Sequence, residues 1–364
     1  MDVARMKFAI LTEKEFEQFA ETTPSNNFYQ SIEMYRRYQK NGTEAYLLGV
    51  KEGKKVLCGA VAVKMSGKKL FKERKIFAAL RGYVMDYDQK RWQEVLECMT
   101  SGAQKFLRER GGIALRISPN VILTPRDNDG TEVPNDGLQR EHLKLMQYLR
   151  RLGYKSVGEY GLGKWLYVLE TRNKQPEELF KAFRKGTRYS IKWAKNRYGV
   201  KVRTLKYDEL GFFKKMVVET GERQGFHDRP LSWYQEVYKE FGRKMRFLVA
   251  EVPEGKKMTP IAVAMFSLYG DEVTYCFSGS SRKYQKYGGS SLMLWQMIEY
   301  ACKNDYRQVN FYGARPVRGN GVYEFKRGFN GRVSELVGTF ILPIGLAGRI
   351  YAAKHRYHEF DERL

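Results

Sequence analysis

The sequence predicts an α+β protein of two tandem domains, each a mixed sheet flanked by helices. Its 364 residues exceed what one hydrophobic core usually serves. Apolar runs of strand length alternate with helical periodicity along the chain, and one order of elements occurs twice. Hydrophobic residues make up 43% and aromatic residues 14%, which is enough to fill two interiors and is not typical of disorder.

The repeated order begins with a hairpin. Residues 45–65 and 246–266 each contain an apolar strand, an E-G-K-K turn and a second apolar strand. An amphipathic helix and a further strand follow at residues 92–117 and 292–311. A period of about 200 residues indicates a duplicated domain, with chance similarity of two α/β halves as the alternative. Because hairpin, helix and strand in this order form the core of the GNAT acyltransferase fold, we expect two GNAT-like domains joined near residues 160–174.

The formal charge of +24, from 65 basic and 41 acidic residues, predicts an anionic partner. Nucleic acid, anionic lipid and a phosphorylated substrate all fit it, and a merely solvated basic surface is the alternative. Residues 181–206 concentrate this charge, with ten basic residues and no acidic one. A proline followed by two acidic residues suits a helix start, so we expect a basic helix over residues 176–198 that attracts phosphates. Its exposed residues are expected to be Arg184, Lys185, Arg188, Lys192 and Lys195.

Neither a metal site nor a membrane span is predicted. The four cysteines are scattered without a C-x-x-C pair, and the four histidines form no cluster with them, so we expect no metal and a reducing, cytoplasmic setting. The most apolar stretch, residues 340–353, is interrupted by Arg349 and is shorter than the roughly 20 residues that cross a bilayer. It predicts a terminal strand and helix, with peripheral contact at the inner face of the membrane as the alternative.

Two glycine-containing segments could bind anions. In residues 285–290, Q-K-Y-G-G-S, backbone amides between a strand and a helix could hold a pyrophosphate, although such glycines more often serve a positive φ. Residues 323–331, Y-E-F-K-R-G-F-N-G, place Lys326 between Phe325 and Phe329. A lysine beside aromatic rings in a cleft can stabilise an oxyanion, and a surface loop with core anchors is an equally good interpretation.

Several segments, taken in order, resemble the FemABX family, the tRNA-dependent aminoacyltransferases that build peptide cross-bridges onto cell-wall precursors. The resemblance covers most of the chain, and its last segment is the most distinctive. The segments are F-Y-Q-S from residue 28, R-G-Y-V-M-D from 81, R-Y-G-V-K-V from 197, E-T-G-E-R-Q-G-F from 219, Y-C-F-S-G-S-S from 275, W-Q-M-I from 295, F-Y-G from 311 and Y-E-F-K-R-G-F-N-G from 323.

The resemblance implies an aminoacyl-tRNA as donor and a UDP-linked or lipid-linked muramyl pentapeptide as acceptor, with no cofactor and no DNA. A stem-peptide amine attacks an ester that is already activated, so the enzyme has to align two anions and stabilise an oxyanion, without a nucleophile of its own. The tail returns to the first domain, giving residues 1–160 with about 341–364 as the acceptor side and residues 161–340 as the tRNA side. By position, the implied catalytic residues are Lys326 and Phe325, and the implied acceptor-binding residues in the second domain are Tyr275, Arg223 and Thr220.

Two departures from the family pattern concern the first domain. Tyr83 stands where the family has the proline of R-G-P, and Ser118 where it often has the aspartate of L-R-I-D-P, so the general base stays unassigned. The lysine that often follows Q-S is displaced. Arg36, Arg37 and Lys40 are therefore the candidates to bind the acceptor's phosphates.

A third departure is in the second domain. Members that act on lipid-linked substrates often carry a coiled-coil arm, whereas residues 251–260 predict only a turn between strands. Two other functions stay open. An acyl-CoA-dependent N-acyltransferase on the same fold would bind CoA, and a non-catalytic RNA-binding protein would bind tRNA without transferring anything.

Overall fold

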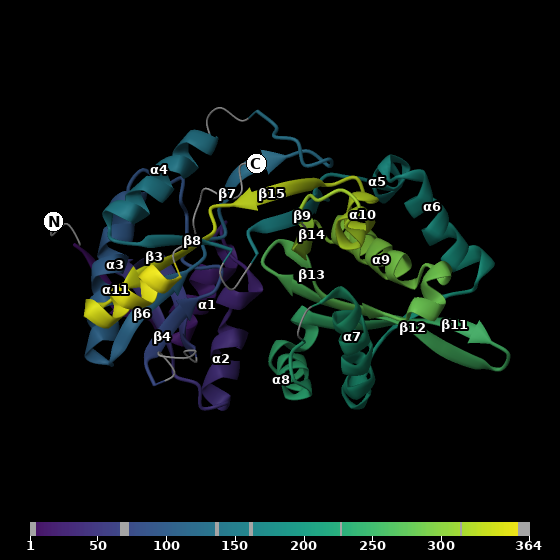
Figure 1. Ribbon diagram of the computed structural model, residues 1–364, viewed down its shortest axis with the longest axis horizontal. Helices are drawn as coiled ribbons and strands as arrows, with labels where there is room; N and C mark the ends of the chain where they lie inside the picture. Colours follow the sequence, from purple (N-terminus) through teal and green to yellow (C-terminus); the bar gives the residue numbers. More distant parts are fainter. Residues whose placement is uncertain are drawn as a thin grey trace. The chain divides into compact units, whose positions relative to one another are not determined.

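The computed structural model describes residues 5–65, 73–134, 138–159, 163–225, 228–313 and 315–355 (Figure 1). The chain divides into two compact units. Unit 1 contains residues 1–125, 133–164 and 335–364, and unit 2 contains residues 126–132 and 165–334. The structure has two mixed sheets flanked by helices, which confirms the predicted fold class.

The first sheet belongs to unit 1. Its strands are β1 (Met6–Ile10), β2 (Ala45–Glu52), β3 (Lys55–Met65), β4 (Lys75–Ala79), β5 (Val84–Met85), β6 (Gly112–Ile117), β8 (Lys155–Gly158) and β16 (Thr339–Pro343). The order is β1-β2-β3-β4-β6-β16-β8, with β5 paired to β3, and β4 and β6 are parallel. The helices of unit 1 are α1 (Glu13–Thr22), α2 (Ile32–Lys40), α3 (Trp92–Glu109), α4 (Leu138–Arg151) and α11 (Gly345–Lys354), with a 3-10 turn η1 (Phe28–Gln30).

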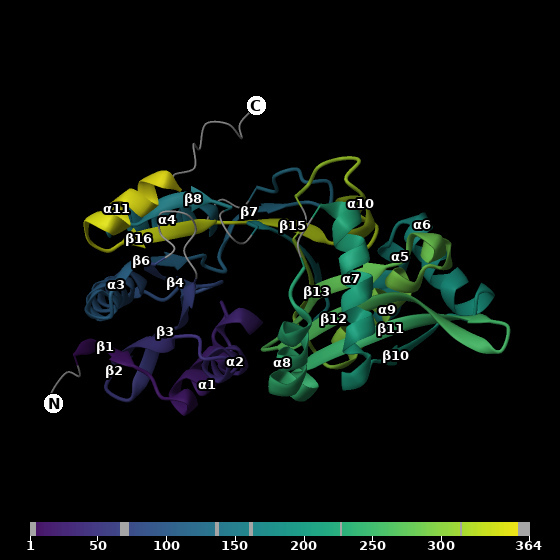
Figure 2. The ribbon, with the colours of Figure 1, turned by 60° about the horizontal axis from the view of Figure 1, so that its bottom comes forward.

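Helices cover both faces of this sheet. Because successive strand residues point to opposite faces, Leu48 packs in the core cluster of α3, while its neighbour Leu47 packs against α1 and α2. Figure 2 shows α3 and α11 on opposite sides of β6 and β16, and both helices contact β6. Within the described ranges of the chain, no helix is long and apolar enough to cross a membrane.

The second sheet has the order β10-β11-β12-β13-β14-β9-β15-β7. Its strands are β7 (Ile122–Arg126), β9 (Trp165–Glu170), β10 (Lys201–Thr204), β11 (Met245–Glu254), β12 (Lys257–Tyr269), β13 (Glu272–Ser280), β14 (Gln308–Gly313) and β15 (Arg332–Leu336). The helices of unit 2 are α5 (Pro176–Ala182), α6 (Lys185–Lys192), α7 (Leu210–Gln224), α8 (Leu231–Phe241), α9 (Gly289–Lys303) and α10 (Gly321–Arg327). Shorter turns are η3 (Trp193–Arg197, a π-helix), η4 (Tyr207–Glu209), η5 (Gly242–Lys244) and η6 (Arg282–Tyr287).

The repeated order predicted from the sequence is present in both units. The β2–β3 hairpin, β4, α3 and β6 of unit 1 correspond to the β11–β12 hairpin, β13, α9 and β14 of unit 2. In each unit the helix connects two parallel strands. In unit 2, α6 and α9 lie on one side of β11, β12 and β13, and α7 and α8 lie on the other (Figure 1).

In unit 2 the pairing of β13 with β14 is short. It ends at Thr274 and Asn310, although β13 continues to Ser280 and β14 to Gly313. The predicted acceptor residue Tyr275 is therefore the first residue of β13 beyond the paired region. Gly313, at the end of β14, also lies beyond the region paired with β13, and it pairs instead with Leu166 of β9.

The sequence predicts one basic helix over residues 176–198, and the structure divides it into α5, α6 and η3. The helix starts at Pro176 as predicted, with two glutamates in its first turn. The break lies at Phe183 and Arg184, which have extended backbones with ψ of 151° and 146°. The extended backbone lets the Arg184 N–H donate to the carbonyl oxygen of Gly328 at 2.9 Å. A distant hydrogen-bond partner thus explains a break that local sequence does not predict.

Candidate active site

Lys326 lies at the end of α10 with its ammonium group buried. The side-chain oxygen of Asn320 starts this helix by accepting hydrogen bonds from the N–H groups of Val322 and Tyr323, at 3.0 and 3.1 Å. Lys326 is 6% exposed, and its Nζ donates to the carbonyl oxygen of Gly313 at 2.5 Å. Burial lowers the pKa of Lys326 to about 7. Near neutral pH the amine can therefore exist in both its protonated and its neutral form.

Aromatic rings fix the position of α10. Phe329 is fully buried, and its ring centroid lies 5.1 Å from that of Phe183, 5.4 Å from that of Phe311 and 5.6 Å from that of Phe325. Phe325 is partly buried against the same core. The predicted core anchors are present. They fix the position of the Lys326 segment and are compatible with a chemical role for Lys326.

A short segment of the chain, residues 126–132, contacts α10; we call it the excursion. Residues 126–132 leave unit 1 and belong to unit 2. The carboxylate of Asp129 accepts a hydrogen bond from Arg327 Nε at 2.6 Å and lies 3.5 Å from the guanidinium groups of both Arg184 and Arg318. The hydrogen bond from Arg327 is the main cause of the lowered pKa of the Asp129 carboxyl group. These pairs tie the excursion both to α10 and to the start of α6.

The same excursion contacts two buried tyrosines. The hydroxyl of Tyr323 donates to the carbonyl oxygen of Asn128 at 2.8 Å, and the hydroxyl of Tyr167 donates to the Asn128 side chain. The Tyr167 hydroxyl also accepts from the N–H of Gly331 at 2.7 Å. These supporting residues were not identified from the sequence. The turn-forming run R-D-N-D-G at residues 126–130 is the signal that could have found them.

The basic helix α6 packs directly on the Lys326 segment. A Cβ atom on Gly328 would lie 2.2 Å from Oγ1 of Thr187, so this close approach requires glycine. The side chain of Arg184 also lies 3.3 Å from the carboxylate of Glu324 on α10. The two segments that the sequence singled out are therefore joined in unit 2, where Glu324 and Gly328, on either side of Lys326 in the sequence, contact the start of the cationic helix.

The five basic residues predicted to bind tRNA fall into two groups. Lys185, Lys192 and Lys195 are exposed. Arg184 is held by the ion pairs with Asp129 and Glu324, and Arg188 donates to the carbonyl oxygens of Lys181 and Phe183, at 2.9 and 2.5 Å. We therefore assign structural contacts to the two arginines and the strongest expectation of phosphate binding to the three lysines.

The three predicted acceptor residues of unit 2 lie on or against β13. Tyr275 belongs to this strand, and Thr220 and Arg223 bond to its last residue, Ser280. Tyr275 packs in the core cluster that includes α9, and burial raises its pKa to about 12, so its hydroxyl stays protonated. Thr220 and Arg223 come from α7 on the other face. The Thr220 hydroxyl accepts from the N–H of Ser280 at 3.0 Å, and Arg223 donates to the Ser280 carbonyl oxygen at 3.2 Å. Both residues thus anchor α7 to the end of β13.

The remaining acceptor candidates lie on α2 of unit 1. Arg36 is paired with Glu13 at 2.7 Å and lies 3.8 Å from Glu17. Arg37 is half-buried, with its guanidinium 5.4 Å from the ring centroid of Tyr38, and Lys40 is exposed in the last turn. Arg37 and Lys40 therefore remain predictions for phosphate binding.

The departures at residues 83 and 118 meet in one turn of unit 1. Ser118 is buried, and its hydroxyl accepts a hydrogen bond from the N–H of Arg81 at 3.0 Å, next to the segment that contains Tyr83. A side chain at position 118 thus holds the R-G-Y turn. Ser118 has no acidic group, so it supplies no carboxylate base, and the general base stays unassigned.

The loop at residues 285–290, considered as a pyrophosphate site, is packed under α6. Gly288 has a φ of +69°, and a Cβ there would lie 2.6 Å from the carbonyl oxygen of Ser190. The hydroxyls of Ser190 and Ser291 are 3.2 Å apart. The glycine therefore serves a positive φ and a close helix contact, as the alternative interpretation predicted.

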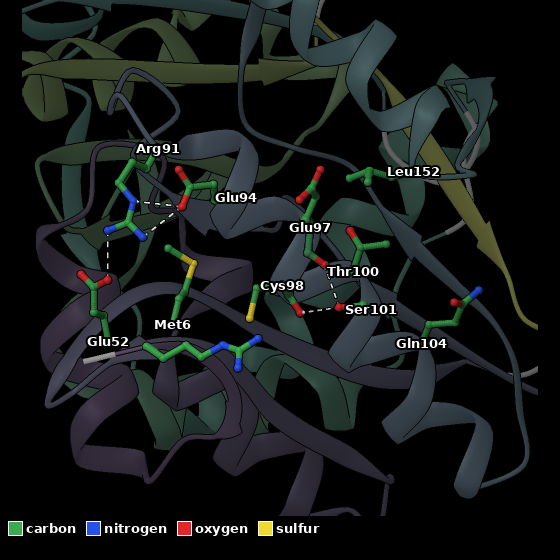
Figure 3. Close-up of a pocket in the computed structure, with 11 residues that line it drawn as sticks. Met6, Glu52, Arg91, Glu94, Glu97, Cys98, Thr100, Ser101, Gln104 and Leu152 are labelled. Atoms are coloured by element: carbon green, nitrogen blue, oxygen red, sulfur yellow. Dashed lines mark hydrogen bonds and ion pairs between the residues drawn. The ribbon is translucent and has the colours of Figure 1, made fainter. Parts of the chain in front are cut away.

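A separate cavity of about 940 Å³ lies in unit 1 along α3 (Figure 3). Arg91 bridges Glu52 at 2.9 Å and Glu94 at 3.0 Å on its rim, and Cys98 lines its wall. Burial raises the pKa of the Cys98 thiol, so this cysteine is not activated as a nucleophile. The eleven lining residues include none of the predicted site residues.

Comparison with known proteins identifies the family of the chain. The model of the FemAB family matches residues 11–254 and 252–355. Aminoacyltransferase FemA of Staphylococcus epidermidis is 27% identical over 93% of this chain and 96% of its own length. Aminoacyltransferase FemA of Staphylococcus aureus (strain MW2) is 26% identical over 99% of this chain and 100% of its own length.

Two solved structures share the fold. The crystal structure of FemX superposes with a TM-score of 0.79 at 17% identity, over 96% of this chain and 100% of FemX. A tandem GNAT protein from the clavulanic acid biosynthesis pathway gives 0.55 at 9% identity, over 94% and 99%. The two family-matched segments meet at residues 252–254, where β11 turns into β12. The match extends from residue 11 to residue 355 and confirms the resemblance, so this protein is a member of the FemAB family.

Proposed function

We propose that this aminoacyltransferase moves an amino acid from an aminoacyl-tRNA to a stem-peptide amine of a muramyl pentapeptide, and so forms an interpeptide bridge of the cell wall. The observation that supports this proposal most directly is that the segment of the buried Lys326 is packed against a cationic helix in unit 2, through the hydrogen bond from Arg184 to Gly328. If the polyanionic tRNA binds along Lys185, Lys192 and Lys195, we expect its aminoacylated 3′ end to lie near Lys326. The relatives named aminoacyltransferase FemA support the same activity.

The reaction needs alignment and charge stabilisation more than covalent help. The amine nitrogen attacks the ester carbonyl carbon, a C–N bond forms, and the C=O electron pair moves onto the oxygen. When the carbonyl re-forms, the bond to the ribose oxygen breaks, and the proton lost by the amine is transferred, in net terms, to that oxygen. A protonated Lys326 would stabilise the oxyanion from a site of low dielectric, where a fixed charge has most effect.

The pKa of about 7 gives Lys326 a second use in this proposal. A general acid works best when its pKa lies near the working pH. The same ammonium could therefore donate a proton to the departing ribose oxygen after it has stabilised the oxyanion. The rate constant for transfer should then depend on an ionisation near neutral pH, which a permanently charged residue would not produce.

The CoA-dependent alternative is less well supported. A GNAT enzyme that uses acyl-CoA holds the pyrophosphate on amides before the helix that corresponds to α9. Here the carbonyl oxygen of Ser190 on α6 lies against Gly288 at that position. We therefore expect CoA to show no saturable binding, which isothermal titration calorimetry measures directly.

For the acceptor, Arg37 and Lys40 of unit 1 are proposed to bind its phosphates. In unit 2, Tyr275, Thr220 and Arg223 are proposed as acceptor-binding residues. An aminoacyl-tRNA donor would place the reaction in the cytoplasm. Peripheral contact with the membrane is a further part of this proposal, because α11 exposes Leu346 by 74% and Ile350 by 46%, with Arg349 between them. Co-sedimentation of a Leu346→Ser/Ile350→Ser variant with anionic vesicles tests that contact.

The central experiment incubates the protein with a mixture of charged tRNAs and either UDP-linked or lipid-linked muramyl pentapeptide, and reads the added mass by mass spectrometry. We expect addition of amino acid residues by the wild type. Lys326→Met should lose at least a hundredfold in transfer while keeping most of its tRNA affinity. If no charged tRNA supports transfer to either acceptor, the protein is better explained as a non-catalytic RNA-binding member of the family.

A further inference from the structure

A row of four side chains lies along α6 and η3. Lys185, Tyr189, Trp193 and Arg197 follow one another at intervals of four residues. The rings of Tyr189 and Trp193 are nearly parallel, with centroids 5.7 Å apart and an interplanar angle of 18°. Lys185 Nζ lies 5.7 Å from the Tyr189 centroid, and Arg197 Cζ lies 5.4 Å from the Trp193 centroid. We name this row the aromatic ladder.

The aromatic ladder is not part of the hydrophobic core. The core side of the same helix is formed by Ile191 and Ala194, which are 3% and 0% exposed. Tyr189 and Trp193, in contrast, are 45% and 46% exposed. Their centroids are too far apart for the rings to overlap fully, so part of each ring face stays accessible. Packing within unit 2 therefore does not explain why two large aromatic side chains stand at these positions.

The surroundings of the aromatic ladder indicate its ligand. It lies within the segment of ten basic and no acidic residues, and Lys192 and Lys195 next to it are exposed. Exposed aromatic rings among cations are what single-stranded nucleic acids bind, since bases stack on the rings and phosphates pair with the cations. A membrane surface fits less well, because the exposed neighbours are charged and not aliphatic.

We propose that Tyr189 and Trp193 form a stacking platform for unpaired bases of an RNA chain whose phosphates are bound by Lys185, Lys192, Lys195 and Arg197. In combination with the proposed function, on which this step rests, the unpaired bases are those at the 3′ end of the donor tRNA. Stacking is tolerant of base identity, so the platform would position the end of any tRNA and leave the choice of amino acid to other features.

The test compares deacylated tRNA with the same tRNA lacking its four 3′-terminal nucleotides. Trp193→Ala should weaken binding of the full-length tRNA about tenfold to a hundredfold, and Tyr189→Ala should weaken it in the same direction. Neither variant should change the affinity for the truncated tRNA. Trp193→Phe, which keeps a ring, should restore most of the affinity. Lys192→Ala/Lys195→Ala should weaken binding of the full-length tRNA more than binding of the truncated one, because the phosphates assigned to these lysines belong to the same unpaired nucleotides.

Tyr207→Ala is the matched control, because Tyr207 is also exposed, by 36%, and has Lys239 Nζ 4.7 Å from its ring centroid. It should bind both RNAs like the wild type. Equal effects of Trp193→Ala on the two tRNAs, or no effect on either, would overturn the platform while leaving the proposed function in place. If Trp193→Ala lost binding to anionic vesicles but kept its RNA binding, the platform would be overturned in favour of a membrane-binding surface.

A short unpaired RNA oligonucleotide separates the two proposals. If the wild type binds the oligonucleotide in a Trp193-dependent way but binds no tRNA, the platform stands and the tRNA-dependent function fails. If it binds neither RNA, both fail. Equal melting temperatures of the wild type and the alanine variants would show that these exposed positions do not act through folding.

Discussion

Lys326 holds its proton less tightly in the folded chain than in the unfolded one, because burial lowers its pKa from 10.5 to about 7. Between these two values the unfolded chain binds a proton that the folded chain does not, so stability rises with pH in this window. Lys326→Met lacks this dependence. From pH 7 to pH 9 the free energy of unfolding of the wild type should therefore increase relative to that of the variant, by up to about 1.4 kcal/mol per pH unit.

Urea denaturation at pH 6, 7, 8 and 9 measures this difference. Lys105→Met, at an exposed lysine of α3, is the control and should differ from the wild type by a constant amount across the range. A constant difference for Lys326→Met as well would show that the ammonium is not desolvated as its burial implies.

Single residues were predicted from the sequence to different degrees. Lys326 could be singled out as a candidate because its motif is the most distinctive segment of the family resemblance. Its carbonyl partner Gly313 could not be, because the contact depends on where β14 ends relative to α10. Asp129 was missed for the same reason: it reaches Arg327 only through a path of the chain that local sequence does not encode.

At the scale of elements, the contact between α6 and α10 depends on the missing side chain of Gly328. Its backbone is helical, with a φ of −60°, so alanine would be accepted by the backbone itself. The added Cβ would collide with Oγ1 of Thr187 at 2.2 Å. Gly328→Ala should therefore destabilise the protein by about 1–3 kcal/mol through overpacking and weaken transfer by displacing α6 from Lys326.

Thr187→Ala removes the colliding hydroxyl and leaves the Thr187 Cβ 3.5 Å away, which is an ordinary contact. The double variant Gly328→Ala/Thr187→Ala should thus recover much of the lost stability and activity. A double-mutant cycle in urea denaturation measures the coupling. Additive losses would show that α6 does not pack on α10 through this pair.

The excursion at residues 126–132 should stabilise α10 in a pH-dependent way. The pKa of Asp129 is lowered in the folded chain, so its pairs contribute stability above the ordinary aspartate pKa of about 3.9 and lose it as pH falls below that value. Asp129→Asn should therefore have a lower melting temperature than the wild type at pH 7, with a smaller difference at pH 3. Asp88→Asn, at an exposed site of unit 1, is the control; a pH-independent deficit of Asp129→Asn would argue against the ion pairs.

At the scale of the whole molecule, the architecture followed from patterns that are repeated and strong. Both hairpins and both crossover helices were predicted because their apolar periodicities are clear. The same order of elements in the two halves of the chain strengthened the assignment in each half. The break at Phe183 and Arg184 was not predicted, because the local sequence favours a continuous helix. Distant contacts oppose that helix: the packing of Phe183 against Trp295 and Phe329, and the hydrogen bond from Arg184 to Gly328. Long-range partners therefore account for what the sequence alone did not predict.

The net charge of +24 leads to a prediction about the whole molecule that separates local binding from general attraction. Each phosphate contact contributes about 0.7 to 0.9 to the slope of log K against log salt concentration. The triple variant Lys185→Ala/Lys192→Ala/Lys195→Ala should therefore reduce the magnitude of this slope for tRNA by about 2 to 3. The triple variant Lys54→Ala/Lys55→Ala/Lys105→Ala removes the same charge from exposed positions of unit 1 and should leave the slope nearly unchanged. Filter-binding titrations at several KCl concentrations measure both slopes, and equal reductions would mean that the tRNA responds to net charge and not to the basic helix.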